Sequence, residues 1–127
     1  MNLQLIAAVA LGGAIGSVAR YLVGIGSGRL FGMAFPWGTL IINVTGSFLI
    51  GTFIALFATR WDLSQAARVF LTVGICGGYT TFSTFSLDAF YLMERGELLS
   101  SAAYMIASVV MSVAALVAAI HLVRTVG

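Results

Sequence analysis

The sequence predicts an all-α membrane protein with four spanning helices, of which the third is broken near its middle. Of the 127 residues, 61% are hydrophobic and only 8% are charged, whereas a soluble domain carries about 25% charged residues. The few charges leave long uncharged segments between them, and these are long enough to cross a bilayer as helices. Within one such segment, residues 74–86 combine three glycines with a run of hydroxyls, a composition that disfavours an uninterrupted helix.

The four spanning segments follow from the positions of the charges. The first carries Arg20 near its end and the third carries Asp88 near its end, whereas the second is free of charge. The second segment measures about 33 Å as a helix, which suits the bilayer core. The predicted segments are residues 3–23, 37–58, 69–91 and 98–123. We expect them to form a single transmembrane domain over residues 1–127, because no stretch is left for a soluble domain.

The predicted connections are short: a glycine-rich one over residues 24–36, a polar one over 59–68 and a tight turn over 94–97. The glycine and hydroxyl run of residues 74–86 lies outside all three. In hydrocarbon, a broken helix is tolerated only where its freed backbone groups are buried in protein, line a cavity or hold an ion. The break in the third segment is therefore the first candidate for a functional site.

Small residues in the first two segments indicate close helix packing. Gly12 and Gly16 form a Gly-x-x-x-Gly pair, and Gly46 and Gly51 lie in the second segment. Such pairs let helix backbones approach closely, either within one chain or between subunits. Both interpretations remain open from the sequence. Because four short segments are too few to enclose a pathway, we expect the chain to oligomerise.

The arginines divide evenly between the two sides of the membrane. With four segments, one side carries Arg60, Arg68 and Arg124, and the other carries Arg20, Arg29 and Arg95. Orientation is set by an excess of Lys and Arg on one side, and here neither side has one. The chain is therefore predicted to insert in both orientations, which permits an antiparallel homodimer. The alternative is that factors which this count misses, such as which helix inserts first, decide a single orientation.

The titratable residues argue against several classes of protein. No acidic residue lies deep in a segment, although a proton-coupled carrier normally needs one there. Asp88 is close to the end of its segment, and His121 stands alone near a boundary. The sequence shows no nucleophile with a neighbouring base and no cluster of metal ligands, so it does not predict an enzyme. Six cationic residues are also too sparse for a nucleic-acid interface.

Neutral hydrogen-bonding side chains instead recur at helical spacing. Residues four apart share one face of a helix, and such stripes occur in the second and fourth segments, while two phenylalanines lie three apart in the third. The stripes are Thr39, Asn43 and Ser47; Tyr104, Ser108 and Ser112; and Phe82 and Phe85, with Ser83 and Ser86 displaced by one. A single polar stripe often serves only helix–helix hydrogen bonding. Three stripes with almost no charge favour a pore.

The chemistry of this lining suits an anion. Amide and hydroxyl groups donate hydrogen bonds, and the edge of a phenyl ring carries the positive part of its quadrupole. Conduction requires binding that is strong enough to replace hydration and weak enough to allow release, and no deep cation is present to trap the ion. The residues alone therefore predict a narrow anion pathway.

Three stretches resemble the bacterial fluoride channels of the Fluc or CrcB family. Residues 77–86 read Gly-Gly-Tyr-Thr-Thr-Phe-Ser-Thr-Phe-Ser, close to the family signature Gly-Gly-x-Thr-Thr-Phe-Ser-Thr-Phe. Residues 12–16 with Arg20-Tyr21, and residues 36–40 with 43–47, agree as well. The resemblance covers essentially the whole chain. It implies a fluoride channel that is an antiparallel homodimer with two pores, and that exports fluoride passively across the bacterial inner membrane.

The resemblance also implies roles for individual residues. Phe82 and Phe85 would present ring edges to dehydrated fluoride, Asn43 would donate a hydrogen bond, and Arg20 would attract anions in an aqueous vestibule. The backbone carbonyls of Gly77 and Thr80, from two subunits, would hold a structural Na⁺ at the dimer centre. The complete predicted pore lining is Asn43, Phe82, Phe85, Ser83, Thr39, Tyr104, Ser108 and Ser112.

Two alternatives belong to other classes. A small multidrug-type transporter has a similar size and can have dual topology, but it needs a membrane-embedded carboxylate. A non-transporting membrane subunit would use the polar stripes only for packing and would give no ion flux. In every case we expect the lipid bilayer to be the chain's environment.

Overall fold

The structure, a computed structural model, describes residues 2–126, which form helices joined by short connections and contain no strand. The elements are α1 (Leu3–Phe31), α2 (Trp37–Thr59), α3 (Gln65–Val69), the π-helix η1 (Phe70–Cys76), α4 (Gly77–Tyr79), α5 (Ser83–Glu94) and α6 (Leu98–Val126). Because α3, η1 and α4 follow one another directly, they form one rod. The predicted all-α architecture is confirmed.

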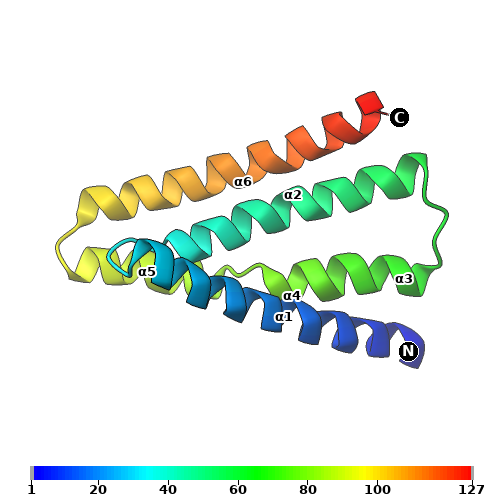
Figure 1. The fold of residues 1–127 in the computed structure, drawn as a ribbon, viewed down its shortest axis with the longest axis horizontal. Coiled ribbons are helices and arrows are strands. Elements are labelled where there is room, and N and C mark those ends of the chain that lie inside the picture. The colour runs from blue at the N-terminus through cyan, green and yellow to red at the C-terminus, as the bar shows by residue number, and fades with distance from the viewer. Residues whose placement is uncertain (1, 127) are drawn as a thin grey trace.

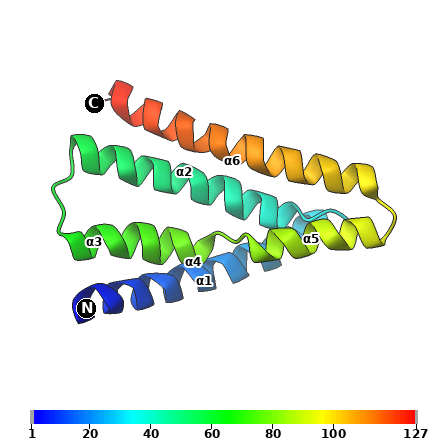
Figure 2. The same cartoon turned by 180° about the vertical axis from the view of Figure 1, so that it is seen from behind.

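The helices cross the molecule in four passes (Figure 1). α2 and α6 lie side by side along their length, and the rod of α3, η1 and α4 packs on α1. Figure 2 shows from behind that α5 continues the direction of the rod beyond a gap in the helix. Both ends of the described chain lie at the same end of the bundle as the connection between α2 and α3. Arg20 departs from the predicted division of the arginines, because its Nε donates to the Gly78 carbonyl beside the break.

Three helices, α1, α2 and α6, are long and apolar enough to cross a membrane, among the residues that the structure describes. The third crossing is made instead of two shorter pieces, which meet at residues 80–82. Thr80 at the end of α4 has an extended backbone, with φ −81° and ψ 161°. The predicted break near the middle of the third segment is thus present.

The first helix is longer than predicted. α1 continues past residue 23 to Phe31, so the prediction of a loop over residues 24–36 is wrong, and the real connection begins at Gly32. Gly32 has φ +78°, which glycine adopts easily, and its N–H donates to the Gly28 carbonyl. The glycines before Gly32 favour a loop by their weak helix propensity, but in a long apolar helix the backbone hydrogen bonds outweigh that propensity.

The second connection is also shorter than predicted. The polar stretch 59–68 contains the start of α3 at Gln65, because Ser64 caps that helix by accepting from the Ala67 N–H at 3.2 Å. The predicted tight turn over residues 94–97 is confirmed, with Gly96 at φ +79° between α5 and α6.

Glycines bring the rod of the third crossing against α1. A Cβ atom built on Gly12 would lie 2.9 Å from the Gly74 Cα atom, and one on Gly78 would lie 2.7 Å from the Gly13 carbonyl oxygen. Neither position has room for a larger residue. Of the two interpretations of the Gly12 and Gly16 pair, the structure supports packing within the chain.

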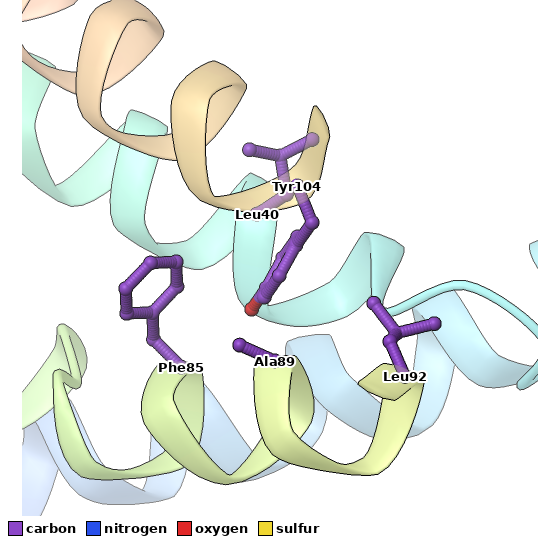
Figure 3. Close-up of a cluster of buried hydrophobic side chains, with 5 residues drawn as sticks. All are labelled: Leu40, Phe85, Ala89, Leu92 and Tyr104. Carbon is purple, nitrogen blue, oxygen red and sulfur yellow. The ribbon is translucent and has the colours of Figure 1, made fainter. Parts of the chain in front are cut away.

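A small apolar cluster joins α5 to α2 and α6 (Figure 3). Its buried members are Leu40, Phe85, Ala89, Leu92 and Tyr104. The Tyr104 ring reaches from α6 toward α5, and Ser101 Oγ, one turn away, donates to the Ala89 carbonyl at 2.9 Å. The two halves of the third crossing therefore have different supports: α1 for the rod, and α2 with α6 for α5.

Candidate functional site

Asn43 on α2 holds the break by two hydrogen bonds to one residue. Its Nδ2 donates to the Thr81 carbonyl, and its Oδ1 accepts from the Thr81 N–H, each at 2.9 Å. A side-chain amide can satisfy a peptide group in this way because it offers one donor and one acceptor side by side. One N–H of Asn43 Nδ2 remains for another partner.

Two further contacts support the break. Arg20 Nε on α1 donates to the Gly78 carbonyl at 3.2 Å, and Thr80 Oγ1 donates to the Cys76 carbonyl at 3.0 Å. Arg20 was predicted to stand in an aqueous vestibule. Its guanidinium lies against the backbone of α4, while the residue also borders a cavity described below. It therefore stabilises the break as well as adding positive charge near it.

The carbonyls of Gly77 and Thr80 lose the donors that an intact helix would give them. In an α-helix these oxygens would accept from the N–H groups of residues 81 and 84. The Thr81 N–H donates to Asn43 instead, and the Thr84 N–H donates to Thr81 Oγ1 at 3.1 Å. Carbonyl oxygens of this kind are typical ligands of hard cations. The two residues predicted to hold Na⁺ thus have free carbonyl oxygens, the kind of ligand atom that such a cation prefers.

An open groove of about 830 Å³ runs along the break between α2, the third crossing and α6. It brings together five of the eight predicted pore residues and both predicted carbonyl residues. The predicted residues on its wall are Asn43, Phe82, Phe85, Ser108, Ser112, Gly77 and Thr80. Phe82 projects into the open, with 76% of its surface exposed, whereas Phe85 is buried. Their ring centroids are 5.5 Å apart.

Two hydroxyls on α6 face this groove without a partner. Ser108 Oγ and Ser112 Oγ are buried, and neither has a hydrogen-bond partner within residues 2–126. Ser and Thr hydroxyls in helices can bond back to the preceding turn, as Thr52 does to the Phe48 carbonyl at 2.9 Å. Buried polar atoms without partners are uncommon in proteins and call for a ligand or water.

A second cavity of about 740 Å³ lies on the other side of the break, beneath the connection between α1 and α2. Its wall carries three arginines and one carboxylate: Arg20, Arg29, Arg95 and Asp88. Thr81 borders both this cavity and the groove. The surplus of positive charge makes this cavity attractive to anions.

Tyr104 and Thr39 lie between the two spaces. Tyr104 is completely buried, and its ring is 5.1 Å from that of Phe85, centroid to centroid. Its hydroxyl donates to Asp88 Oδ2 at 3.1 Å. Thr39 is buried and borders the cavity, not the groove. The predicted stripe from Thr39 to Ser47 is therefore divided, with Thr39 on the cavity and Asn43 and Ser47 on the groove.

Ser83 lies apart from both spaces. It is exposed at the start of α5, and its hydroxyl is 3.4 Å from Thr81 Oγ1. Its predicted place in the pore lining stays a prediction.

Sequence reasoning did not single out Thr81 and Asp88. Thr81 lies within the signature, and Asn43, an amide in the middle of an apolar segment, is the signal that a polar backbone group lies opposite it. Asp88 lies near the end of the predicted third segment, and that position alone indicated a helix-terminal or interfacial charge. The structure places it against Tyr104 at the base of the cavity.

The chain matches known proteins over nearly its full length. Residues 7–120 match the family model described as CrcB-like protein, Camphor Resistance (CrcB). The chain is 71% identical to the fluoride-specific ion channel FluC of Nitrobacter winogradskyi, over 99% of this chain and 100% of that relative. It is 70% identical to fluoride-specific ion channel FluC 1 of Nitrobacter hamburgensis, over 98% of each. The identity to FluC of Agrobacterium fabrum is 58%, over 94% of this chain and 95% of the relative.

Proposed function

We propose that this chain, which belongs to the CrcB-like family, is a fluoride-selective ion channel of the bacterial inner membrane. The family match and the names of the curated relatives support this function and confirm the resemblance that residues 77–86 predicted. They also agree with the prediction that the chain is not an enzyme. A passive channel lets fluoride leave the cytoplasm and so lowers its toxic concentration there.

The observation that carries the proposal is the groove at the break. It combines two phenyl rings, an amide with a remaining N–H, and two buried hydroxyls without partners. Each of these groups offers positive charge or a hydrogen to an anion, and none is a carboxylate. A small anion that loses its water in the groove would find substitutes for it there. A large organic cation would find no such substitutes in the groove.

The phenylalanines act through their ring edges. Phe82 and Phe85 both line the groove, and their rings are inclined to one another by 46° at a centroid separation of 5.5 Å. Ring edges attract an anion weakly and without a formal charge. Weak attraction keeps release fast, because the ion meets no fixed cation in the groove.

The charged cavity supplies anions to the groove. Arginines around the cavity raise the local concentration of anions, and Thr81, which borders both spaces, marks the way from one to the other. We propose that Thr39 and Tyr104 act at this passage, where they can pass an anion from water to the dehydrating groove.

A second copy of the chain would close the groove. The wall includes apolar residues that are exposed in one chain, among them Ile54, Val73, Val109 and Val113. We propose an antiparallel homodimer, in which each chain is a single four-helix domain. The even count of arginines in the sequence, three for each predicted side, supports insertion in both orientations.

We further propose that Na⁺ at the dimer centre binds the carbonyls of Gly77 and Thr80. The support is that both oxygens have lost their helical donors to Asn43 and Thr81. Two copies would supply four oxygens, a suitable set for a hard cation. The ion would stabilise the break by satisfying backbone groups that hydrocarbon cannot.

The decisive experiment is anion release from liposomes that contain the purified protein, loaded with potassium fluoride or potassium chloride. Fluoride release, followed with an ion-selective electrode, should be rapid only when valinomycin lets potassium follow, because a passive channel moves charge. Chloride release should stay near that of protein-free liposomes. Equal release of both anions would contradict selectivity, and no release from folded protein would support a non-transporting subunit.

A further inference from the structure

Tyr79 lies between the two carbonyl residues of the break and is tied to the neighbouring helix. It is the last residue of α4, its side chain is buried, and its hydroxyl is 2.9 Å from Thr45 Oγ1 on α2. A buried hydroxyl in an apolar segment needs a hydrogen-bond partner, and Thr45 is the one that Tyr79 has.

The direction of this hydrogen bond follows from the other contacts of Thr45. A threonine hydroxyl has one hydrogen, and Thr45 Oγ1 lies 2.7 Å from the Ile41 carbonyl, to which it donates. Thr45 is therefore the acceptor toward Tyr79, and the Tyr79 hydroxyl is the donor. The bond links α4 to the backbone of α2 through one intermediate oxygen.

The Tyr79 ring is also fixed by its surroundings. A Cβ atom built on Gly46 would lie 3.1 Å from Tyr79 Cδ2, so the ring rests on the bare backbone of α2. On the opposite side, a Cβ on Gly16 of α1 would lie 2.8 Å from the Tyr79 N atom. The residue is held between two helices with its hydroxyl anchored at the far end.

We propose that Tyr79 is a positioning residue for the cation: through its bond to Thr45 it fixes the spacing of the Gly77 and Thr80 carbonyls and so sets the sodium affinity of the break. The inference rests on the proposed function, because the sodium site belongs to it. Asn43 fixes the peptide after Thr80, and Arg20 fixes the carbonyl of Gly78. Tyr79 supplies the remaining restraint, on the segment between the two carbonyl groups.

The test measures binding without relying on flux. A ligand that binds only the folded protein raises its melting temperature with concentration, so the detergent-solubilised full chain is unfolded thermally over a series of sodium concentrations at constant ionic strength, with N-methylglucamine as the replacement. We expect Tyr79→Phe and Thr45→Val to raise the sodium concentration for half-maximal stabilisation about three- to tenfold, the effect of one lost hydrogen bond. Thr45→Ser keeps the acceptor and should resemble the unsubstituted protein.

Matched controls separate this role from simple stability. Thr52→Val removes the same kind of bond within α2 but no contact to another helix, and Tyr91→Phe removes the hydroxyl of an exposed tyrosine. Neither should move the sodium midpoint. The combined Tyr79→Phe and Thr45→Val protein should shift no further than the larger single shift, because both changes remove one bond.

Three results would overturn the inference: an unchanged midpoint in both single variants, a uniform loss of stability at every sodium concentration, or a protein whose stability does not depend on sodium. Failure of the proposed function is distinguishable. Sodium-dependent stability with shifted midpoints, but no fluoride release from liposomes, would reject the channel and retain the positioning role.

Discussion

Asn43 on α2 binds both the N–H and the C=O of Thr81, each at 2.9 Å, and thereby takes the place of the helix that residues 80–82 interrupt. Because the Thr81 N–H donates to Asn43, it does not donate to the Gly77 carbonyl, as it would in an intact helix. The Asn43 side chain thus satisfies the backbone N–H and C=O of Thr81 and leaves the Gly77 carbonyl free to bind a ligand. Asn43 is a structural part of the break as well as a candidate donor to the anion.

The first prediction concerns this amide. Asn43→Asp keeps the acceptor for the Thr81 N–H but loses the donor to its carbonyl, and it adds a negative charge beside the groove. We expect fluoride release to fall at least a hundredfold and the free energy of unfolding to fall by about 1–3 kcal/mol. Asn2→Asp is the control, because Asn2 caps α1 at the surface and aspartate caps equally well. Release at the unsubstituted rate would show that the amide is dispensable.

The second prediction separates the two rings. Phe82→Ile and Phe85→Ile both remove a ring edge, and both should impair fluoride release while leaving the protein folded. Only the second should lower the unfolding free energy, by about 1–2 kcal/mol, because Phe85 is buried in the cluster with Tyr104. Phe90→Ile, on an exposed face of α5, should change neither release nor stability. Unchanged release in both pore variants would remove the ring-edge mechanism.

The third prediction concerns the hydroxyls without partners. Ser108→Ala and Ser112→Ala should leave stability unchanged or raise it, because each removes a buried polar atom that no protein group satisfies. Both should slow fluoride release, about tenfold or more. Ser101→Ala should do the opposite, lowering stability without slowing release, because Ser101 donates to the Ala89 carbonyl away from the groove. If the Ser108 and Ser112 variants lost stability, these hydroxyls would be structural.

The fourth prediction tests the contact between α1 and the third crossing. Gly12→Ala would place a methyl group 2.9 Å from the Gly74 Cα atom, so the two backbones must separate, at a cost of about 1–3 kcal/mol in unfolding free energy. Gly13→Ala is the matched control, because no atom lies within 4 Å of the added carbon. Thermal unfolding in detergent gives the comparison. Equal stability of the two variants would show that this contact is loose.

Periodicity and composition were sufficient to predict the four crossings and the position of the break. The run of glycines and hydroxyls over residues 74–86 indicated an interruption of the third crossing, and the structure places it at residues 80–82, after the three glycines, which are themselves helical. The end of α1 could not be predicted in this way, because glycines that weaken an isolated helix remain helical in an apolar segment.

The site was predictable as a set of residues but not as an arrangement. Helical spacing correctly placed Asn43 and Ser47 together on one wall, and Ser108 with Ser112 on another. It did not show that Thr39 belongs to a different cavity or that Tyr104 is completely buried. Those facts depend on where α5 crosses α2 and α6, which is a relation between elements far apart in the sequence. The pair of hydrogen bonds between Asn43 and Thr81 depends on the same relation between distant elements.

The divided third crossing has a consequence for how the chain enters the membrane. α5 has 12 residues, about 18 Å as a helix, and neither it nor the rod before it reaches across a bilayer alone. Asn43 from α2 binds a backbone group between them, and Arg20 from α1 binds a carbonyl at the end of the rod. During synthesis both helices emerge before residue 65, so the partners of the break already exist when it leaves the ribosome. A circularly permuted chain that began at α3 would present the break first, and its third crossing would have to insert without them.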